Sequence, residues 1–256
     1  MIIKFSLDSK SLKRQVPIAM YLPDDYMASR QSYPVLYMLD GQNLFYDEDA
    51  SFGRSWRLIT PLQQLDQPMI VVGIESSREG LDRLAEYSPC PFYDANFHQS
   101  FKADGKKTLT FLTKVLKPYV DAHFPTRKGR NWTWIGGSSC GATMALQGLM
   151  QASNVYSKAV LLSPYVTVME GSLLAMLDET TFRLPSSVFM SWGAREGGSA
   201  HEFIRETETC TQIANILQEK GVPAWFHVRH EGEHNEAAWE QEAPLFLNFL
   251  IHQKHS

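Results

Sequence analysis

The sequence predicts an α/β protein with one open, mostly parallel sheet that is covered by helices on both faces. Two observations predict this fold class. Short apolar runs, bounded by polar or turn residues, recur along the chain, as expected for strands buried on both faces. Amphipathic helical patterns alternate with these runs without a break, which favours a single sheet over separate layers. We therefore expect one domain over residues 1–256.

The expected strands are short and rich in apolar residues. They cover 16–22, 35–39, 69–74, 132–135, 159–162, 188–192 and 224–228. In open parallel sheets the functional groups collect beyond the carboxyl ends of the strands. This rule directs attention to the segments 40–43, 136–141 and 193–197, and to the residues after Val228.

Helical patterns fill the chain between these runs. They cover 106–122, 142–150, 201–220 and 237–251. Apolar residues in the first recur at close to the helical period of 3.6, and Pro118 fits there only near the helix end or with a kink. Gly221 stands where the third helix is expected to stop.

Composition and charge exclude several classes of function. The net charge is −4 and no block of like charges occurs, so nucleic acid is not an expected partner. Three widely spaced cysteines predict neither a disulfide framework nor a zinc ribbon. No window approaches the ~20 apolar residues of a membrane span, and the N-terminal segment does not resemble a signal peptide. We therefore expect a cytoplasmic protein with no membrane partner.

The segment TWIGGSSCGATMAL joins an apolar run to a helical pattern and contains G-x-S-x-G, with Ser139 at its centre. So sharp a strand-to-helix turn strains the backbone of its serine and lifts the hydroxyl above the sheet. Gly137 and Gly141 flank the serine because only very small residues fit there. In this context the motif indicates the nucleophile of an α/β-hydrolase fold. The alternative is an ordinary turn with Ser138 or Ser139 as helix N-cap.

A serine nucleophile needs a base, and in this fold the base follows the nucleophile and the acid along the chain. The stretch FHVRHEGEHNEAAW offers three histidines. His234 lies in a polar loop before the last helix and is the preferred base. His230, at the strand end, is the fallback, whereas His227 lies inside the strand pattern. The alternative of a metal site lacks a fitting Cys or Asp cluster.

The acid is expected directly behind the strand that precedes the histidines. Glu196 is the only carboxylate close to that strand end, and it would hold the imidazole in the correct tautomer. The alternative is a surface glutamate beside Arg195. Other carboxylates are less well placed, namely Glu170, Asp178 and Glu202.

The oxyanion donors are expected at two backbone positions. The run VLYML ends in DGQNLF, where a small residue lets the backbone approach a substrate carbonyl. We expect the amides of Gln42 and Cys140 to be the two donors. The alternative is that Asp40-Gly41 simply ends a strand. Two further features stay open. One is whether a group of aromatics lines a cleft or belongs to the core, namely Phe45, Tyr46, Phe52 and Trp56. The other is whether the segment 89–101 caps the site or is a surface loop.

Five segments resemble the esterase branch of the α/β-hydrolases that includes esterase D, siderophore esterases, feruloyl esterases and mycolyltransferases. They are VLYMLDGQNLF, VGIESSREGLDRLAEYSP, WIGGSSCGATMALQGL, MSWGAREG and EGEHNEAAW. The resemblance implies a triad of Ser139, Glu196 and His234, oxyanion amides at Gln42 and Cys140, and a structural role for Arg83 and Tyr87. The chain departs from the family pattern at Cys140 and Ala142, where Met and Gly are usual. A donor that is a backbone amide tolerates the Cys side chain.

These observations predict a serine esterase that hydrolyses a small-molecule carboxylic ester without a metal or organic cofactor. Ser139 would attack the carbonyl, His234 would take its proton and water would release the acid. The alternatives are an acyltransferase, a non-catalytic binding protein on the same scaffold, a metal-dependent hydrolase and a nucleophilic Cys140. The acyl and alcohol parts of the substrate, and whether the chain forms a homo-oligomer, stay open.

Overall fold

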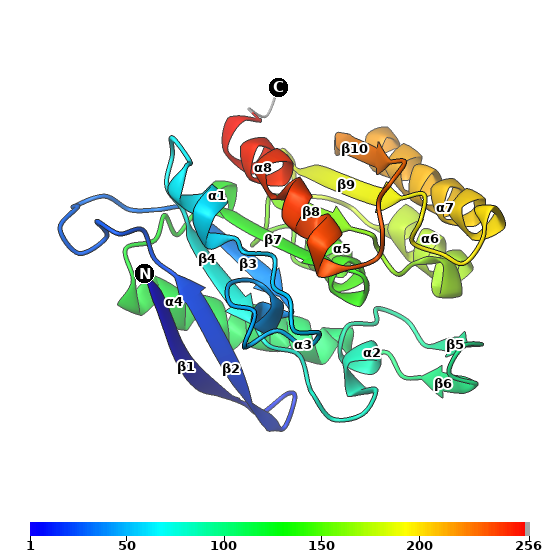
Figure 1. Cartoon of the computed structure of the whole chain (residues 1–256), viewed down its shortest axis with the longest axis horizontal. Helices are drawn as coiled ribbons and strands as arrows, with labels where there is room; N and C mark the ends of the chain where they lie inside the picture. The colour runs from blue at the N-terminus through cyan, green and yellow to red at the C-terminus, as the bar shows by residue number, and fades with distance from the viewer. Residues whose placement is uncertain (254–256) are drawn as a thin grey trace.

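The large sheet runs through the whole molecule in the strand order β1-β2-β4-β3-β7-β8-β9-β10 (Figure 1). The computed structural model describes residues 1–253. Strands β3 to β10 of this sheet pair in parallel, whereas β1 and β2 are antiparallel additions at one edge. The strands are β1 (Ile2–Ser9), β2 (Arg14–Tyr21), β3 (Val35–Leu39), β4 (Ile70–Ile74), β7 (Thr133–Ser138), β8 (Lys158–Leu162), β9 (Ser187–Gly193) and β10 (Ala224–Arg229). The expected fold class is confirmed.

Each strand expected from the apolar runs is present in this sheet, with shifts only at its ends. Strand β1 was not predicted from the sequence, because one face of this edge strand contacts solvent and its residues alternate between half-buried and exposed. Nor was a small hairpin of β5 (Phe92–Asp94) and β6 (Gln99–Phe101), which is too short to show a pattern.

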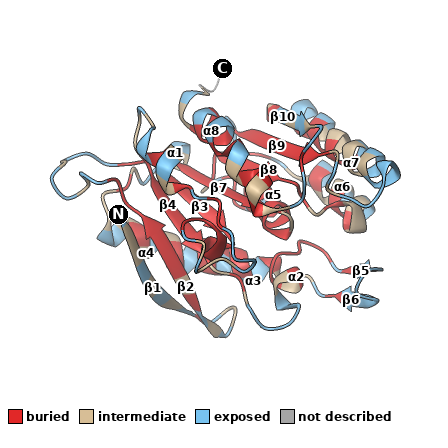
Figure 2. Ribbon diagram, viewed as in Figure 1, coloured by how far each residue is buried: buried red, intermediate tan, exposed pale blue. Residues whose placement is uncertain are grey.

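Helices cover both faces of the sheet, and the strand residues alternate between two apolar clusters. In β3, Val35, Tyr37 and Leu39 join one cluster, while Leu36 and Met38 join the other. Figure 2 shows the buried strands between helices whose outer sides are exposed. One face carries α3 (Gly105–Phe111), α4 (Lys117–His123), α5 (Cys140–Gln151), α6 (Glu170–Glu179) and α7 (Ala200–Glu219), and the other α1 (Ile59–Gln63) and α8 (Glu236–His252).

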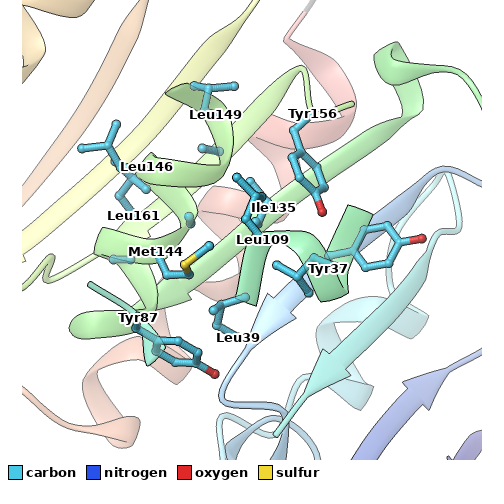
Figure 3. Packing of buried hydrophobic residues seen from close by; sticks show 14 of the residues in the cluster. Tyr37, Leu39, Tyr87, Leu109, Ile135, Met144, Leu146, Leu149, Tyr156 and Leu161 are labelled. Carbon is cyan, nitrogen blue, oxygen red and sulfur yellow. The ribbon is translucent and has the colours of Figure 1, made fainter. Parts of the chain in front are cut away.

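Helix α5 is the most deeply packed helix of the site. Its residues from Cys140 to Met150 are all buried, and Met144, Leu146 and Leu149 lie against the strands in Figure 3. A Cβ at Gly148 would lie 2.8 Å from the Ile135 side chain, so the helix approaches β7 more closely than alanine would allow. This packing holds the first turn of α5 at the carboxyl end of β7.

The helix expected over 106–122 is interrupted. A π-helical turn, Leu112–Leu116, separates α3 from α4, and Pro118 is the second residue of α4. The backbone stays helical through this turn, where the Lys117 amide donates to the Leu112 carbonyl five residues back, and this altered bonding accommodates a proline, which has no N–H to donate. Gly221 lies two residues beyond the end of α7 and has a φ of 74°, as expected of a residue that stops a helix. Within residues 1–253, no helix is both long and apolar enough to cross a bilayer.

Candidate active site

Ser139 occupies the turn between β7 and α5 in a strained conformation, with φ 55° and ψ −126°. Its two glycine neighbours are required by the crowding of this turn. A Cβ at Gly137 would lie 2.7 Å from the backbone of Gly141, and a Cβ at Gly141 would lie 3.0 Å from Asp40 Oδ2. The expected strained elbow is therefore present. Glycine is needed at both flanking positions because side chains there would force the strand and the helix apart.

Glu196 and His234 come together although 38 residues separate them. Glu196 follows β9 and His234 follows β10, so neighbouring parallel strands deliver both side chains to one edge of the sheet. His234 Nδ1 lies 2.9 Å from Glu196 Oε2, with the carboxylate side chain 4% exposed and the imidazole 33% exposed. His230 is 89% exposed and contacts Glu231 instead. The preferred histidine, rather than the fallback, therefore meets the expected acid.

A cavity of about 680 Å³ opens above the elbow, and Ser139 and His234 both line it. Within residues 1–253, no hydrogen bond joins the Ser139 hydroxyl directly to the imidazole. Such bonds are often long in free enzymes and tighten when substrate binds. The cavity thus presents a hydroxyl and an imidazole to the same bound molecule.

A second set of contacts fixes the carboxylate of Glu196. The Ser163 hydroxyl donates to Glu196 Oε1 at 2.6 Å, and the Gly193 amide donates to the same oxygen. The indole N–H of Trp239 donates in turn to Ser163 Oγ at 2.9 Å. The Trp239 ring also packs edge-on against His234, with centroids 5.2 Å apart. Neither Ser163 nor Trp239 was predicted from the sequence, although Ser163 follows β8 at the same sheet edge as the expected acid.

Another carboxyl lies near this pair. Burial, together with the neighbouring charge of Glu196, raises the pKa of Glu206 to about 8. Glu206 is therefore mostly protonated at neutral pH. It adds little negative charge beside Glu196 under those conditions.

The loop after β3 carries the first expected oxyanion amide. A Cβ at Gly41 would lie 2.3 Å from the Gly73 carbonyl carbon, so only glycine lets this loop pack on β4. A 3-10 turn, Gly41–Asn43, follows and places Gln42 at the cavity. Among the described residues, neither the Gln42 amide nor the Cys140 amide donates to a protein acceptor. Both N–H groups are therefore free for a ligand.

Asp40, whose carboxylate is buried, holds this loop through an ion pair with the partly exposed Arg83. Its backbone is left-handed, with φ 57°, and its carboxylate accepts two hydrogen bonds from Arg83, at 2.7 and 2.6 Å. The guanidinium lies 5.4 Å from the ring centroid of Tyr87, whose hydroxyl accepts from the Asp40 amide. Although burial disfavours its charge, Asp40 raises the pKa of Arg83. Arg83 and Tyr87 thus both contact the loop at Asp40, as expected of the structural role that the resemblance implies.

The structure also places the features that stayed open. Phe52 lines the cavity, whereas Phe45 and Trp56 lie in the apolar core. Among the described residues, none from 89–101 lines the cavity. Burial raises the pKa of the Cys140 thiol, which disfavours the thiolate that a nucleophilic cysteine needs.

The histidines do not converge as a metal site would require. His227 lines a separate surface pocket beside β10. Within residues 1–253, no three side chains of His, Cys, Asp or Glu are grouped so that they could hold a metal ion.

The mostly parallel sheet, with its strand-to-helix elbow at the carboxyl edge, places the chain in the α/β-hydrolase fold class. The model of the family described as "Putative esterase" matches residues 9–245. Since the match spans most of the chain, the chain belongs to this family and is a carboxylic ester hydrolase.

The chain is also similar to individual proteins. "Uncharacterized protein YbbA" of Bacillus subtilis (strain 168) is 24% identical over 79% of this chain and 78% of its own. An IroE-like serine hydrolase from Shewanella oneidensis has a TM-score of 0.76 at 20% identity, covering 96% of this chain and 80% of that one. The siderophore hydrolase EstB from Aspergillus nidulans has a TM-score of 0.74 at 15% identity, covering 97% and 94%. Both structures share the fold.

Proposed function

We propose that this hydrolase is a serine esterase that forms an acyl-enzyme on Ser139, with His234 as the base and Glu196 as its acid partner. The observation that carries the proposal is the 2.9 Å contact between Glu196 and His234 beside a cavity that the strained elbow serine also lines. Three groups from three separate loops would not be expected to gather at one sheet edge for packing alone. A binding protein on this scaffold would need none of them.

The mechanism follows from the protonation chemistry of these groups. His234 takes the proton of the Ser139 hydroxyl as the oxygen attacks the ester carbonyl, and then gives that proton to the leaving alcohol oxygen. Water then attacks the acyl carbonyl while His234 takes one of its protons. The acyl–serine bond breaks, His234 returns this proton to the Ser139 oxygen, and the acid leaves. Glu196 holds Nδ1 protonated, so that Nε2 is free to act as the base.

The charge that develops on the carbonyl oxygen needs preorganised donors. The unpaired amides of Gln42 and Cys140 support this role, since they require no reorganisation when the tetrahedral intermediate forms. Cys140 also begins α5, whose N-terminal partial charge favours an oxyanion. In other enzymes one such donor is worth about 3 kcal/mol in the transition state.

The products formed from p-nitrophenyl butyrate in the presence of methanol test hydrolysis against acyl transfer. We expect nitrophenol release with butyric acid as the main acyl product, because the site has an open cavity that admits water. Methyl butyrate as the main product would instead identify an acyltransferase. If an ester panel that includes feruloyl and siderophore esters gives no turnover at all, the proposal fails.

The Ser163→Ala variant is expected to lower kcat by about tenfold to a hundredfold, because a hydrogen bond to a charged group is lost beside the base. Ser163 has a left-handed backbone, with φ 47°. Ser163→Gly therefore relieves strain while also lacking the hydroxyl, and it should lose activity to a similar extent. Steady-state kinetics of both variants check this result. A glycine variant with native kcat would show that the hydroxyl does not matter.

A further inference from the structure

One carboxylate in the cavity has no part in the mechanism described so far. Glu236 is the first residue of α8, is only 6% exposed and lines the same cavity as Ser139 and His234. Among the described residues, its one hydrogen-bond donor on another side chain is Asn43, at 3.2 Å from Oε1. A buried carboxylate with so little compensation is unfavourable unless something else satisfies it.

Burial raises the pKa of Glu236 more than the nearby charges of His234 and Arg83 lower it, so these cations compensate only in part. Within residues 1–253, Glu236 forms no ion pair, and both arginines that line the cavity are engaged elsewhere. Arg83 binds Asp40, and Arg78 binds Glu75. The N-terminus of α8 offers partial positive charge. Burial still outweighs this contribution and raises the pKa of Glu236.

A second acceptor in the cavity wall, on Gln42, is unsatisfied within the part of the chain that the structure describes. Gln42 is 4% exposed, and its Nε2 donates to Ser51 and to Ser76. Its Oε1 is buried and accepts no hydrogen bond from any residue in the range 1–253. Buried polar atoms are rarely left unpaired in native structures. The wall that contains Gln42 and Glu236 thus has two side-chain acceptors that are not fully hydrogen-bonded.

The position of Glu236 along the chain indicates which part of an ester it would contact. In the proposed reaction His234 delivers a proton to the leaving alcohol oxygen, so that oxygen must lie next to the imidazole. Glu236 follows His234 by two residues, and Asn235 between them is the N-cap of α8, with its side chain accepting from the Ala238 amide. The N-capped start of α8 therefore fixes the carboxylate two residues from the imidazole, next to which the leaving alcohol would lie.

We propose that Glu236 binds a hydrogen-bond donor, a hydroxyl or an ammonium group, on the alcohol part of the ester. Glu236 is then a specificity-determining residue, and the alcohols released are polar rather than simple alkyl ones. Gln42 Oε1 adds a second acceptor for the same group or a neighbouring one. This inference rests on the proposed esterase activity.

A matched series of butyrate esters tests the inference. The alcohol part carries a terminal hydroxyl, a terminal dimethylammonium or, as the donor-free reference, a terminal methoxy group, on spacers of increasing length. We expect kcat/KM for the best donor-bearing ester to exceed that of its methoxy counterpart by about tenfold or more, the usual effect of a hydrogen bond to a charged group. A preference for dimethylammonium alone would identify a cationic alcohol, and a preference for both donors a hydroxylated one.

The Glu236→Gln variant removes the charge but keeps an oxygen for Asn43. We expect the ratio of donor-bearing to methoxy kcat/KM to fall by about tenfold for the ammonium ester and less for the hydroxyl ester, because an amide oxygen still accepts from a hydroxyl. The matched control is Glu240→Gln. Glu240 lies on the same helix but pairs with Arg54 outside the cavity. The Glu240→Gln variant should therefore keep the native ratio of donor-bearing to methoxy kcat/KM.

The outcomes separate the two proposals. Two results would overturn the role of Glu236 while the esterase proposal stands. In one, all esters are hydrolysed but Glu236→Gln leaves the ratio of donor-bearing to methoxy kcat/KM unchanged. In the other, the native protein hydrolyses the esters without preferring either donor. Absence of hydrolysis for all esters would instead overturn the proposed function.

Discussion

The Ser139→Ala variant is expected to lose ester hydrolysis almost completely, with kcat lower by a factor on the order of 10⁵ or more. The reason is chemical: without the hydroxyl no acyl-enzyme can form, and only uncatalysed attack by water within the cavity remains. Initial rates with p-nitrophenyl butyrate measure this loss. Near-ultraviolet circular dichroism checks that the elbow variant is folded.

The adjacent serine provides the control for this experiment. Ser138 lies at the end of β7 and is 3% exposed, and its backbone carbonyl, rather than its hydroxyl, contacts Arg83. We expect Ser138→Ala to keep kcat within about tenfold of the native value, because it removes no group used in the reaction. A comparable loss in both variants, or retained turnover in Ser139→Ala, would contradict the assignment of the nucleophile.

The Glu196→Gln variant is expected to lower kcat by about 10³- to 10⁴-fold. An amide at this position can present its NH₂ group to His234, which favours the wrong tautomer and leaves the imidazolium without a counter-charge. The Ser163 hydroxyl and the Gly193 amide, which now donate to the carboxylate, would hold the amide oxygen and turn the NH₂ group toward the imidazole. The pH profile of kcat, measured for both proteins, checks this result.

Glu206 offers a matched control for the loss of a carboxylate. Its pKa is raised to about 8 by burial and by Glu196, so below pH 8 it is mainly neutral and Glu206→Gln changes little charge. We expect this variant to keep near-native kcat at pH 7. Above pH 8 the native protein gains a negative charge beside Glu196 that the variant does not. If Glu196→Gln were no more harmful than Glu206→Gln at pH 7, Glu196 would not be the acid partner.

The main features of the fold and the elbow could be predicted from the sequence because local signals specify them. Buried parallel strands appear as apolar runs, and the spacing of Gly137, Ser139 and Gly141 reflects crowding within a single turn. Glu196 and His234 could be proposed because parallel strands place the loops that follow them at the same edge of the sheet.

The remaining contacts depend on the way that distant segments pack. Trp239 reaches Ser163 across 76 residues, and Asn43 reaches Glu236 across 193, so no local pattern signals either contact. Trp56 and Phe52 are close in sequence, yet one lies in the core and the other lines the cavity. Edge strand β1 could not be predicted for another reason, because its solvent-exposed residues interrupt the apolar run.

Labelling with a fluorophosphonate, which reacts only with an activated serine, tests the central claim most directly. The account predicts one adduct per chain, located on Ser139 by peptide mass mapping, absent from Ser139→Ala and formed much more slowly in a His234→Ala variant. An adduct on another residue, or labelling of Ser139 at the native rate without the imidazole, would contradict it.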